Sequence, residues 1–579
     1  MELWTCVLLL SVAVVGVTSE EQSPANEEWR ELMTPQGPVR GRRNPQAEHL
    51  FVFYNIPYAT APTNENKFKP PQPAPNWTTP FEAINRNIVC PQTVIPIPGL
   101  PALGNVQEDC LIANVYVPDT PDKNLTVLVY VHGGAFVLGY GEMFIVNRLL
   151  ENKDIILVTF NYRVGIHGFL CLGTDDVPGN AGMKDQVELL RWVQKNIASY
   201  GGNPNDVILG GFSAGSASVD LLMLSKSAEG LFHRVIAESG GNLAAFGIQR
   251  DPVAIAKYQA AKLNFTNVDD ISALEQFYKT LPMEVLTADL FLDRTDSTFL
   301  FSPCIERESA AEPFLTESPL SILKKGSYKK LPLLYGFANM EGLFRINFLD
   351  TWTNQMNEKF SDFLPADLTF ESASEKEEVA DKIKKFYFDD EPITVSSVLH
   401  YVDFFTDVIF AFPMLWAVKL QAEAGNNEIY LYEYSFVDDN TTYVPYTNEK
   451  GADHCAQTAA LMDGYNEDLE TLAYQNMRKT IRESWRNFIK SGKPMPEWQA
   501  AGADRSPYMS LGVEVRLINE PLLGNRTQLW EEIYENHYLE PVPPTSHALS
   551  FKITRVLLPI IITVHIVRYD LYKNHYKII

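Results

Sequence analysis

Short runs of continuously apolar residues alternate with longer stretches of helical spacing along most of the chain. Runs that are apolar at every position are typical of strands covered on both faces. The pattern predicts six such strands, at Val127–Val131, Ile155–Asn161, Val207–Gly211, Val235–Glu238, Leu331–Gly336 and Ile429–Tyr434. Between two of them, residues 183–200 place their apolar side chains on one helical stripe, and the Gly-Gly-Asn-Pro run at 201–204 ends that helix.

The alternation of strands and helices predicts the fold class. It implies an α/β protein with a large, mostly parallel central sheet and helices on both faces. In such a fold, ligands bind at the carboxyl ends of the strands. The sequence shows no internal repeat and no low-complexity block, so we expect one domain over residues 20–540.

The two ends of the chain differ from this body. Residues 1–19 hold an apolar run, Cys6–Val17, which Glu20 and Glu21 follow shortly after, and they are predicted to be a signal peptide. Residues 541–579 are predicted to be a tail, which is basic and partly apolar. Its apolar run would reach about 18 Å as a helix, against roughly 30 Å of hydrocarbon in a bilayer. A loose tail, an interfacial anchor and a spanning segment all stay open, so any weak membrane contact is expected through this tail.

Charge and composition narrow the range of partners. The 579 residues include 48 Lys and Arg against 72 Asp and Glu, which gives a net charge of −24. Phosphates would be repelled, so we expect no nucleic-acid partner. With only 6 Cys the chain is not a disulfide-dense miniprotein. Export would allow glycosylation at five sequons, which begin at Asn76, Asn124, Asn264, Asn440 and Asn525.

A Gly-Phe-Ser-Ala-Gly run at residues 211–215 is the clearest chemical motif. It follows a predicted strand and precedes an apolar stretch, 216–224, that is typical of a helix. This is the context that a nucleophile elbow requires, because the glycines permit a tight turn. The turn would place the hydroxyl of Ser213 at a helix N-terminus, where the helix dipole favours developing negative charge.

A second glycine motif follows the predicted strand Val127–Val131. Residues 132–136 are His-Gly-Gly-Ala-Phe. Attack on an ester puts charge on the carbonyl oxygen, and backbone N–H groups without obstructing side chains can stabilise it. We therefore predict an oxyanion hole formed by the N–H groups of Gly133, Gly134 and Ala214.

A serine nucleophile needs a base, and in this class of sheet the chain order is serine, acid, histidine. Among the histidines after Ser213, His454 lies in a loop of small residues after the strand at 429–434. His233 lies on a short segment just before a strand, and the histidines from His537 onwards lie at or beyond the end of the body. A loop of this kind can carry a base over the sheet, which makes His454 a candidate for the base.

The acid must fall between the nucleophile and this histidine. Glu341 follows the predicted strand at 331–336, at the sheet edge where chemistry is expected, and a carboxylate there would orient the imidazole. Spacing alone leaves Asp403 and Asp407 open as alternatives.

At this point the sequence resembles the type-B carboxylesterases, the branch of the α/β-hydrolases that also holds the cholinesterases. Besides the two glycine motifs, the resemblance rests on residues 108–116, 161–165 and 179–186, and it extends over nearly all of residues 28–535. The overall texture is similar to insect secreted or antennal esterases. The resemblance implies that Ser213, Glu341 and His454 form a catalytic triad and that Ser239 supports it.

The resemblance also implies a disulfide between Cys90 and Cys110. It leaves Cys171, Cys304 and Cys455 without an evident bridge, so we expect these three to be small buried residues.

Three departures from the family concern rate and substrate. Phe212 stands before the nucleophile, where the family usually has Glu, and residues 455–457 are Cys-Ala-Gln, where acidic residues often follow the histidine. The 90–110 loop contains no Trp, the residue with which cholinesterases bind a quaternary ammonium. Choline esters are therefore disfavoured.

Together these features predict a secreted serine carboxylesterase that acts through an acyl-enzyme. The expected substrates are uncharged lipophilic esters of xenobiotic, odorant or pheromone type. No cofactor and no metal are expected, the only partner predicted is the small-molecule ester, and the motifs do not encode an oligomeric state. Two alternatives stay open: a non-catalytic binding protein on the same fold, and a scavenger that reacts once with its ester.

Overall fold

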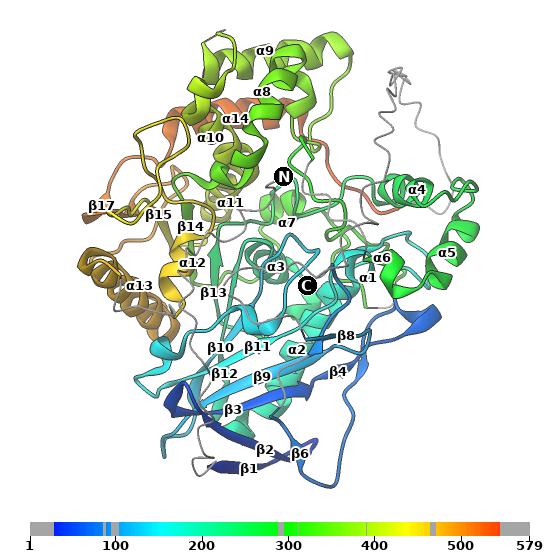
Figure 1. The fold of residues 1–579 in the computed structure, drawn as a ribbon, viewed down its shortest axis with the longest axis vertical. Coiled ribbons are helices and arrows are strands. Elements are labelled where there is room, and N and C mark those ends of the chain that lie inside the picture. Colours follow the sequence, from blue (N-terminus) through cyan, green and yellow to red (C-terminus); the bar gives the residue numbers. More distant parts are fainter. Residues whose placement is uncertain are drawn as a thin grey trace, which may run out of the picture. The chain divides into compact units, whose positions relative to one another are not determined.

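A sheet of 13 strands runs through the body of the protein (Figure 1). The structure is a computed structural model that describes residues 28–84, 88–93, 104–287, 294–310, 312–389, 391–463 and 470–544. The predicted signal peptide and the predicted tail from residue 545 lie outside the described residues. The tail's first residues are described, and Pro541 and Pro544 are buried against the body.

Neighbouring strands of the large sheet follow the order β1-β2-β3-β9-β11-β10-β12-β13-β14-β15-β16-β17, with β6 beside β2. Their bounds are β1 Trp29–Thr34, β2 Gly37–Asn44, β3 Ala47–Pro57, β6 Phe81–Glu82, β9 Ile112–Pro118, β10 Leu125–Val131, β11 Ile155–Phe160, β12 Gly202–Phe212, β13 Arg234–Glu238, β14 Leu333–Ala338, β15 Ile429–Tyr434, β16 Tyr508–Leu511 and β17 Val515–Ile518. Two small sheets pair β4 (Ala59–Thr60) with β5 (Gln72–Pro73) and β7 (Ile88–Val89) with β8 (Asn105–Val106).

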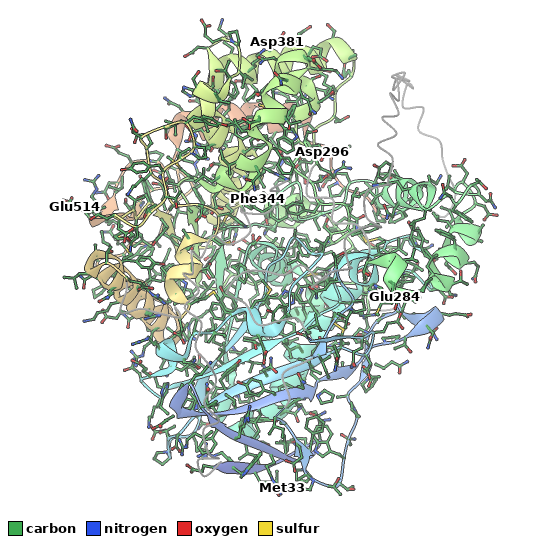
Figure 2. All side chains as sticks on the ribbon, viewed as in Figure 1. Met33, Glu284, Asp296, Phe344, Asp381 and Glu514 are labelled. Atoms are coloured by element: carbon green, nitrogen blue, oxygen red, sulfur yellow. A yellow bond between two sulfur atoms is a disulfide. The ribbon has the colours of Figure 1, made fainter. Side chains whose placement is uncertain are left out.

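The strands from β11 to β16 in this order run parallel to one another. The six predicted strands are β10 to β15, so these predictions are confirmed. The strands β1, β2, β3 and β9 pair antiparallel at one side of the sheet and were not predicted. Met33, on the edge strand β1, is exposed to solvent (Figure 2).

Fourteen α-helices lie in the described residues. Their bounds are α1 Gly165–Phe169, α2 Ala181–Asn196, α3 Ala214–Leu224, α4 Pro252–Lys262, α5 Ile271–Thr280, α6 Met283–Leu286, α7 Pro319–Lys325, α8 Leu349–Glu358, α9 Ala373–Phe388, α10 Val398–Thr406, α11 Phe412–Glu423, α12 Ala456–Leu461, α13 Leu472–Ser491 and α14 Gly524–His537. The predicted helix over 183–200 corresponds to α2 and the 3₁₀ turn that follows it, and Gly201 ends it at φ 92°.

The sheet has an apolar core on each face. In β10, Val127 and Val129 pack into one cluster of buried side chains, and Leu128 and Tyr130 pack into another. Successive side chains of a strand point to opposite faces, so the two clusters mark the two faces of the sheet. Helices such as α2, α3, α10 and α11 contribute to the first cluster, and α12 and α13 contribute to the second. The predicted α/β architecture is confirmed.

One helical stretch of the described residues, Val395–Glu423, is long and apolar enough to cross a membrane. However, 94% of its most apolar window is buried inside the protein. Its side chains contribute to the first apolar cluster, as those of a core helix do.

Two disulfides are present among the described residues. Cys90 and Cys110 are bonded, as the resemblance implied. Cys171 and Cys304 are also bonded, so the expectation that both stay unpaired is wrong. They lie 133 residues apart, a spacing that gives no signal in the sequence. Asn180 holds the backbone of Cys304, because its side chain donates to the carbonyl oxygen of Cys304 and accepts from the backbone N–H of that residue. Cys455 is free, as expected, but it is partly exposed, so the expectation that it is buried is wrong.

Candidate active site

Ser213 lies on a strained turn between β12 and α3. Its backbone has φ 55° and ψ −124°, a conformation that non-glycine residues rarely adopt. The glycines on either side make the turn possible, because a Cβ on Gly211 would stand 2.5 Å from the carbonyl oxygen of Gly215. A Cβ on Gly215 would stand on the carbonyl oxygen of Val131 at the end of β10. The predicted nucleophile elbow is therefore formed by backbone packing.

The hydroxyl of Ser213 is hydrogen-bonded to the predicted base. Nε2 of His454 lies 2.9 Å from Oγ of Ser213, and Nδ1 of the same ring lies 2.5 Å from Oε2 of Glu341. A carboxylate only accepts, so Nδ1–H donates to it and Nε2 is left to accept from the serine hydroxyl. Ser213 and His454 are partly exposed, whereas Glu341 is fully buried.

The alternative acids are bound elsewhere. Asp403 and Asp407 both accept from the guanidinium of Arg526 in α14. Glu341, by contrast, is the first residue after the turn that follows β14, and its other oxygen, Oε1, accepts from the N–H of Ala338 at 2.8 Å. Of the three acids that spacing left open, Glu341 is the one that contacts His454.

Ser239 forms a hydrogen bond to the carboxylate of Glu341. Its hydroxyl donates to Oε1 of Glu341 at 2.5 Å, and it accepts from the side-chain amide of Gln457 at 2.6 Å. An amide NH₂ group can only donate, so the serine proton is directed towards the carboxylate. Gln457, which the sequence marked only as a departure from the family, therefore helps to hold the acid in place.

The glycine loop after β10 presents backbone donors near the nucleophile. The N–H groups of Gly133, Gly134 and Ala214 donate to no acceptor among the described residues. Gly134 has φ 109°, and a Cβ there would stand on the carbonyl oxygen of Leu138. A Cβ on Gly133 would stand 2.8 Å from both the ring and the carbonyl oxygen of Phe212. Only glycine therefore fits at these two positions.

His132 fixes the direction of one of these donors. Nδ1 of His132 lies 2.8 Å from the carbonyl oxygen of Gly133, and the ring stacks on Tyr162 with centroids 4.2 Å apart. Burial lowers the pKa of His132 to about 4, so the ring is neutral near pH 7 and its Nδ1–H donates. This hydrogen bond fixes the carbonyl of Gly133. Because the peptide between Gly133 and Gly134 is planar, it also fixes the direction of the N–H of Gly134.

Phe212 packs as an apolar support under this loop. Its ring lies against Gly133 and stacks on Tyr130 at 6.2 Å. The hydroxyl of Tyr130 donates to the buried carboxyl of Glu238 at 2.5 Å, and Nε1–H of Trp485 donates to the same group at 3.1 Å. Burial raises the pKa of Glu238 to about 7. The protein therefore has a buried titratable carboxyl group at Glu238, although Phe212, the residue before Ser213, is not acidic.

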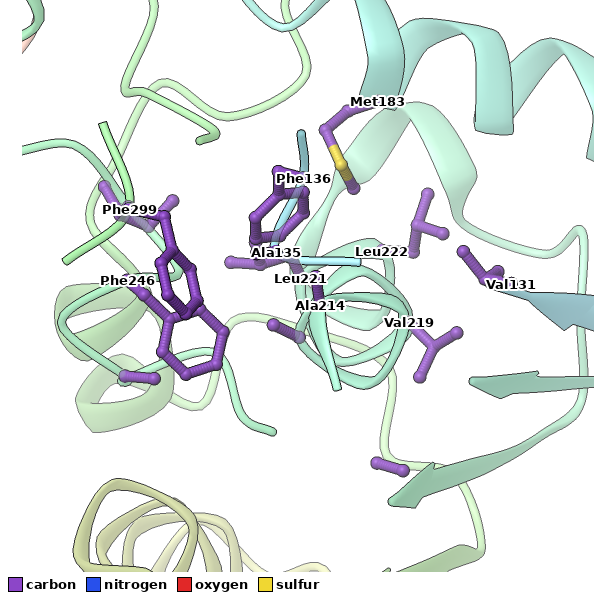
Figure 3. Close-up of a cluster of buried hydrophobic side chains, with 14 of the residues drawn as sticks. Val131, Ala135, Phe136, Met183, Ala214, Val219, Leu221, Leu222, Phe246 and Phe299 are labelled. Carbon is purple, nitrogen blue, oxygen red and sulfur yellow. The ribbon is translucent and has the colours of Figure 1, made fainter. Parts of the chain in front are cut away.

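Aromatic and small apolar side chains surround the reacting groups. Phe344 and Phe410 contact the ring of His454, with centroids 5.2 Å and 4.4 Å away. Figure 3 shows Phe246 and Phe299 side by side near Ala135 and Ala214, and the two phenyl centroids are 5.2 Å apart. No local motif predicts this lining, because its members come from six separate places in the chain.

The predicted glycosylation sites lie at the surface. All five asparagines are exposed: Asn76, Asn124, Asn264, Asn440 and Asn525. Asn525 differs from the others because it lies in the first turn of α14, where Thr527 of the same sequon is buried and bonded to the backbone. Among the described residues, no group of three or more His, Cys, Asp or Glu side chains is placed to hold a metal ion.

Comparison with known proteins shows the family to which the chain belongs. The sequence profile of the Carboxylesterase family matches residues 29–530, and the chain belongs to this family of ester hydrolases. A carboxylic ester hydrolase from Bombus ignitus is 30% identical over 89% of this chain and 94% of its own length. The juvenile hormone esterase of Heliothis virescens is 30% identical over 80% of this chain and 85% of its own length.

Among solved structures, the chain is similar to the juvenile hormone esterase from Manduca sexta with OTFP covalently attached. The TM-score is 0.78 at 29% identity, and the match covers 88% of this chain and all of that one. The protein is thus an α/β-hydrolase and a carboxylic-ester hydrolase of the serine type, related to insect carboxylesterases.

Proposed function

We propose that the protein is a secreted carboxylesterase that hydrolyses uncharged, lipophilic esters through an acyl-enzyme on Ser213. The observation that carries this proposal is the continuous hydrogen-bond chain from Ser213 through His454 to Glu341. It lies beside three backbone N–H groups that donate to no acceptor among the described residues. This combination supplies a nucleophile, a base and donors for an oxyanion in one place.

In the first half of the reaction, Oγ of Ser213 attacks the ester carbonyl carbon while Nε2 of His454 takes the hydroxyl proton. The N–H groups of Gly133, Gly134 and Ala214 would stabilise the charge that develops on the carbonyl oxygen. The carbon–oxygen bond to the alcohol then breaks, and the imidazolium gives its proton to the leaving oxygen. Glu341 holds the imidazole in the tautomer that this transfer needs.

In the second half, water attacks the acyl carbon and His454 takes a proton from it. The bond between Oγ of Ser213 and the acyl carbon breaks, the proton returns to Oγ, and the carboxylic acid leaves. The same donors serve both halves, so no other group is required.

The surroundings of the nucleophile support an uncharged substrate. The rings of Phe344 and Phe410 pack on His454. The rings of Phe246 and Phe299 lie near the methyl groups of Ala135 and Ala214 (Figure 3). A charged substrate group placed against such side chains would lose its hydration and gain no compensating hydrogen bond. A xenobiotic, odorant or pheromone-type ester fits this lining.

Secretion is supported by two kinds of evidence from the body. Its two disulfides are typical of an oxidising compartment. Its five sequon asparagines are exposed, as glycosylation would require. Both agree with the predicted signal peptide at residues 1–19.

A time course with p-nitrophenyl esters of increasing acyl length tests this proposal. We expect a burst of nitrophenol followed by steady turnover, with kcat/KM rising from acetate to a longer acyl chain. A choline ester of the same acyl group should be a poor substrate. A stoichiometric burst without turnover would instead identify a scavenger, and the absence of both in folded protein would identify a binding protein.

A further inference from the structure

The long apolar helix beside the site contains one widened turn. Residues Asp407–Ala411 form a π-helical turn, η9, between α10 and α11. The N–H of Phe412 donates to the carbonyl oxygen of Asp407, a bond that spans five residues where an α-helix spans four. Such turns are rare and occur frequently at functional sites.

Pro413 gives a physical reason for this turn. Proline has no N–H, and in a regular helix its ring would clash with the carbonyl group four residues earlier. That carbonyl belongs to Ile409, inside the widened turn. The helix thus accommodates the proline by adding one residue to the turn before it rather than by ending.

The widened turn separates two side chains that an α-helix would place together. Residues three apart share a face of an α-helix, so Asp407 and Phe410 would lie on one side. Here Asp407 is buried and binds Arg526 in α14, with two contacts of 2.6 Å, and it accepts from the hydroxyl of Tyr387 in α9. Phe410 points instead to the catalytic centre and stacks on His454.

Phe410 covers one face of the imidazole. The two rings are 4.4 Å apart at 29°, which is a stacked geometry, while Phe344 meets the imidazole edge-on at 5.2 Å. The same helix also contacts the acid, because the hydroxyl of Thr406 accepts from the N–H of Gly342 at 2.8 Å. One helix therefore packs on the histidine and holds the residue that follows Glu341.

We propose that the π turn at 407–411 is a positioning device, and that Phe410 is the positioning residue that holds the imidazole of His454 in line between Ser213 and Glu341. This rests on the proposed function of the triad. Proton transfer needs Nε2 to stay within hydrogen-bond reach of both the serine oxygen and the leaving oxygen. A ring that can tilt away from this line loses rate in the chemical step and not in substrate binding.

The test compares Phe410→Leu with a matched variant, Phe405→Leu. Phe405 lies in the same helix and is equally buried, but it packs on Tyr401 and Trp352 and not on His454. Both changes remove one buried ring, so their unfolding temperatures should fall by similar amounts. Only Phe410→Leu should lower kcat, by about tenfold, with KM within about twofold of the wild type.

Two esters separate positioning from pocket shape. If Phe410 positions the imidazole, kcat falls by the same factor for p-nitrophenyl acetate and for a longer acyl chain. If Phe410 only lines the pocket, the effect depends on acyl length and appears in KM, and the proposal is wrong. Phe410→Tyr, which keeps the stacked ring, should retain most of the wild-type kcat, and Phe410→Met replaces the leucine variant if that one does not fold.

Wild-type turnover keeps the two proposals apart. If the wild type shows no burst and no turnover, the proposed function fails. If the wild type turns over normally and Phe410→Leu matches Phe405→Leu in kcat for both esters, the proposed function stands and the positioning role of Phe410 is refuted.

Discussion

The nucleophile side of the site, residues 131–136 and 211–215, is shaped by contacts between backbone atoms. The histidine side, residues 338–344, 402–410 and 451–457, is shaped mainly by contacts that side chains make between separate segments. On the first side, a Cβ on Gly134 or Gly215 would stand on a backbone oxygen. On the second, Glu341 and His454 are 113 residues apart and are held by Ser239 and Phe410. Local motifs therefore describe the first side, and tertiary packing decides the second.

The largest expected effect is on the histidine side. Glu341→Gln keeps the size of the side chain but replaces a pure acceptor by an amide, so the imidazole loses the partner that fixes its tautomer. We expect kcat to fall by about 10⁴-fold. Steady-state kinetics with one p-nitrophenyl ester measures this.

Asp403→Asn is the control for this change, because Asp403 is the acid that spacing left open and that contacts Arg526 rather than His454. It should keep kcat close to the wild-type value. A loss in Asp403→Asn comparable with that in Glu341→Gln would mean that the acid has been assigned wrongly.

Removing the second disulfide tests whether the nucleophile side depends on a distant covalent link. In the double variant Cys171→Ala, Cys304→Ala, a loop of 133 residues is no longer closed in the unfolded chain. The free energy of unfolding should fall by about 5 kcal/mol from the regained loop entropy. Chemical denaturation measures this loss, and kcat of the remaining folded protein should be unchanged if the backbone contacts of the elbow suffice.

Gly134→Ala tests the backbone contacts directly. The added methyl group would stand on the carbonyl oxygen of Leu138 and displace a proposed oxyanion donor. We expect kcat to fall by about 10²–10³-fold. Gly230→Ala is the matched control, because Gly230 also has a positive φ, 83°, but has no atom within 4 Å of the added Cβ. If both variants lose the same activity, backbone strain and not the lost donor is the cause.

The smallest expected effect is on stability and concerns Glu238, whose buried carboxyl group accepts from Tyr130 and Trp485. Its pKa is raised to about 7 in the folded protein, above its ordinary value, so folding favours the protonated form. The stability that this provides is complete at low pH and is lost as the pH rises to about 7. Glu238→Gln removes the titration and should gain about 3 kcal/mol relative to the wild type between pH 4.5 and pH 8.

Thermal unfolding of both proteins at several pH values measures this difference. Equal shifts of the unfolding temperature at all pH values would show that Glu238 does not titrate in this range.

The sequence alone predicted the parts of the protein that depend on residues close together in the chain. Strands β10 to β15, the elbow around Ser213 and the paired glycines each follow from a short run of residues. The disulfide between Cys171 and Cys304 was missed because its partners lie 133 residues apart and meet only in the folded chain. The stack of Phe410 on His454 was missed because it depends on one widened helical turn, which apolar periodicity does not show.

The preference for Glu341 over Asp403 and Asp407 also required the three-dimensional structure. All three carboxyl groups lie in the expected interval of the chain, and only their contacts differ. An arginine from α14, more than 100 residues further along, binds the other two. These long-range contacts therefore favour Glu341 as the proposed acid, a preference that chain order alone does not give.

Locating a fluorophosphonate adduct by mass spectrometry tests the central claim most directly. The reagent reacts with an activated serine, and its adduct blocks the acyl step. We expect one adduct per chain, on Ser213, with turnover of a p-nitrophenyl ester lost in proportion to labelling and no adduct in Ser213→Ala. An adduct on another residue, or full turnover in fully labelled protein, would contradict the account.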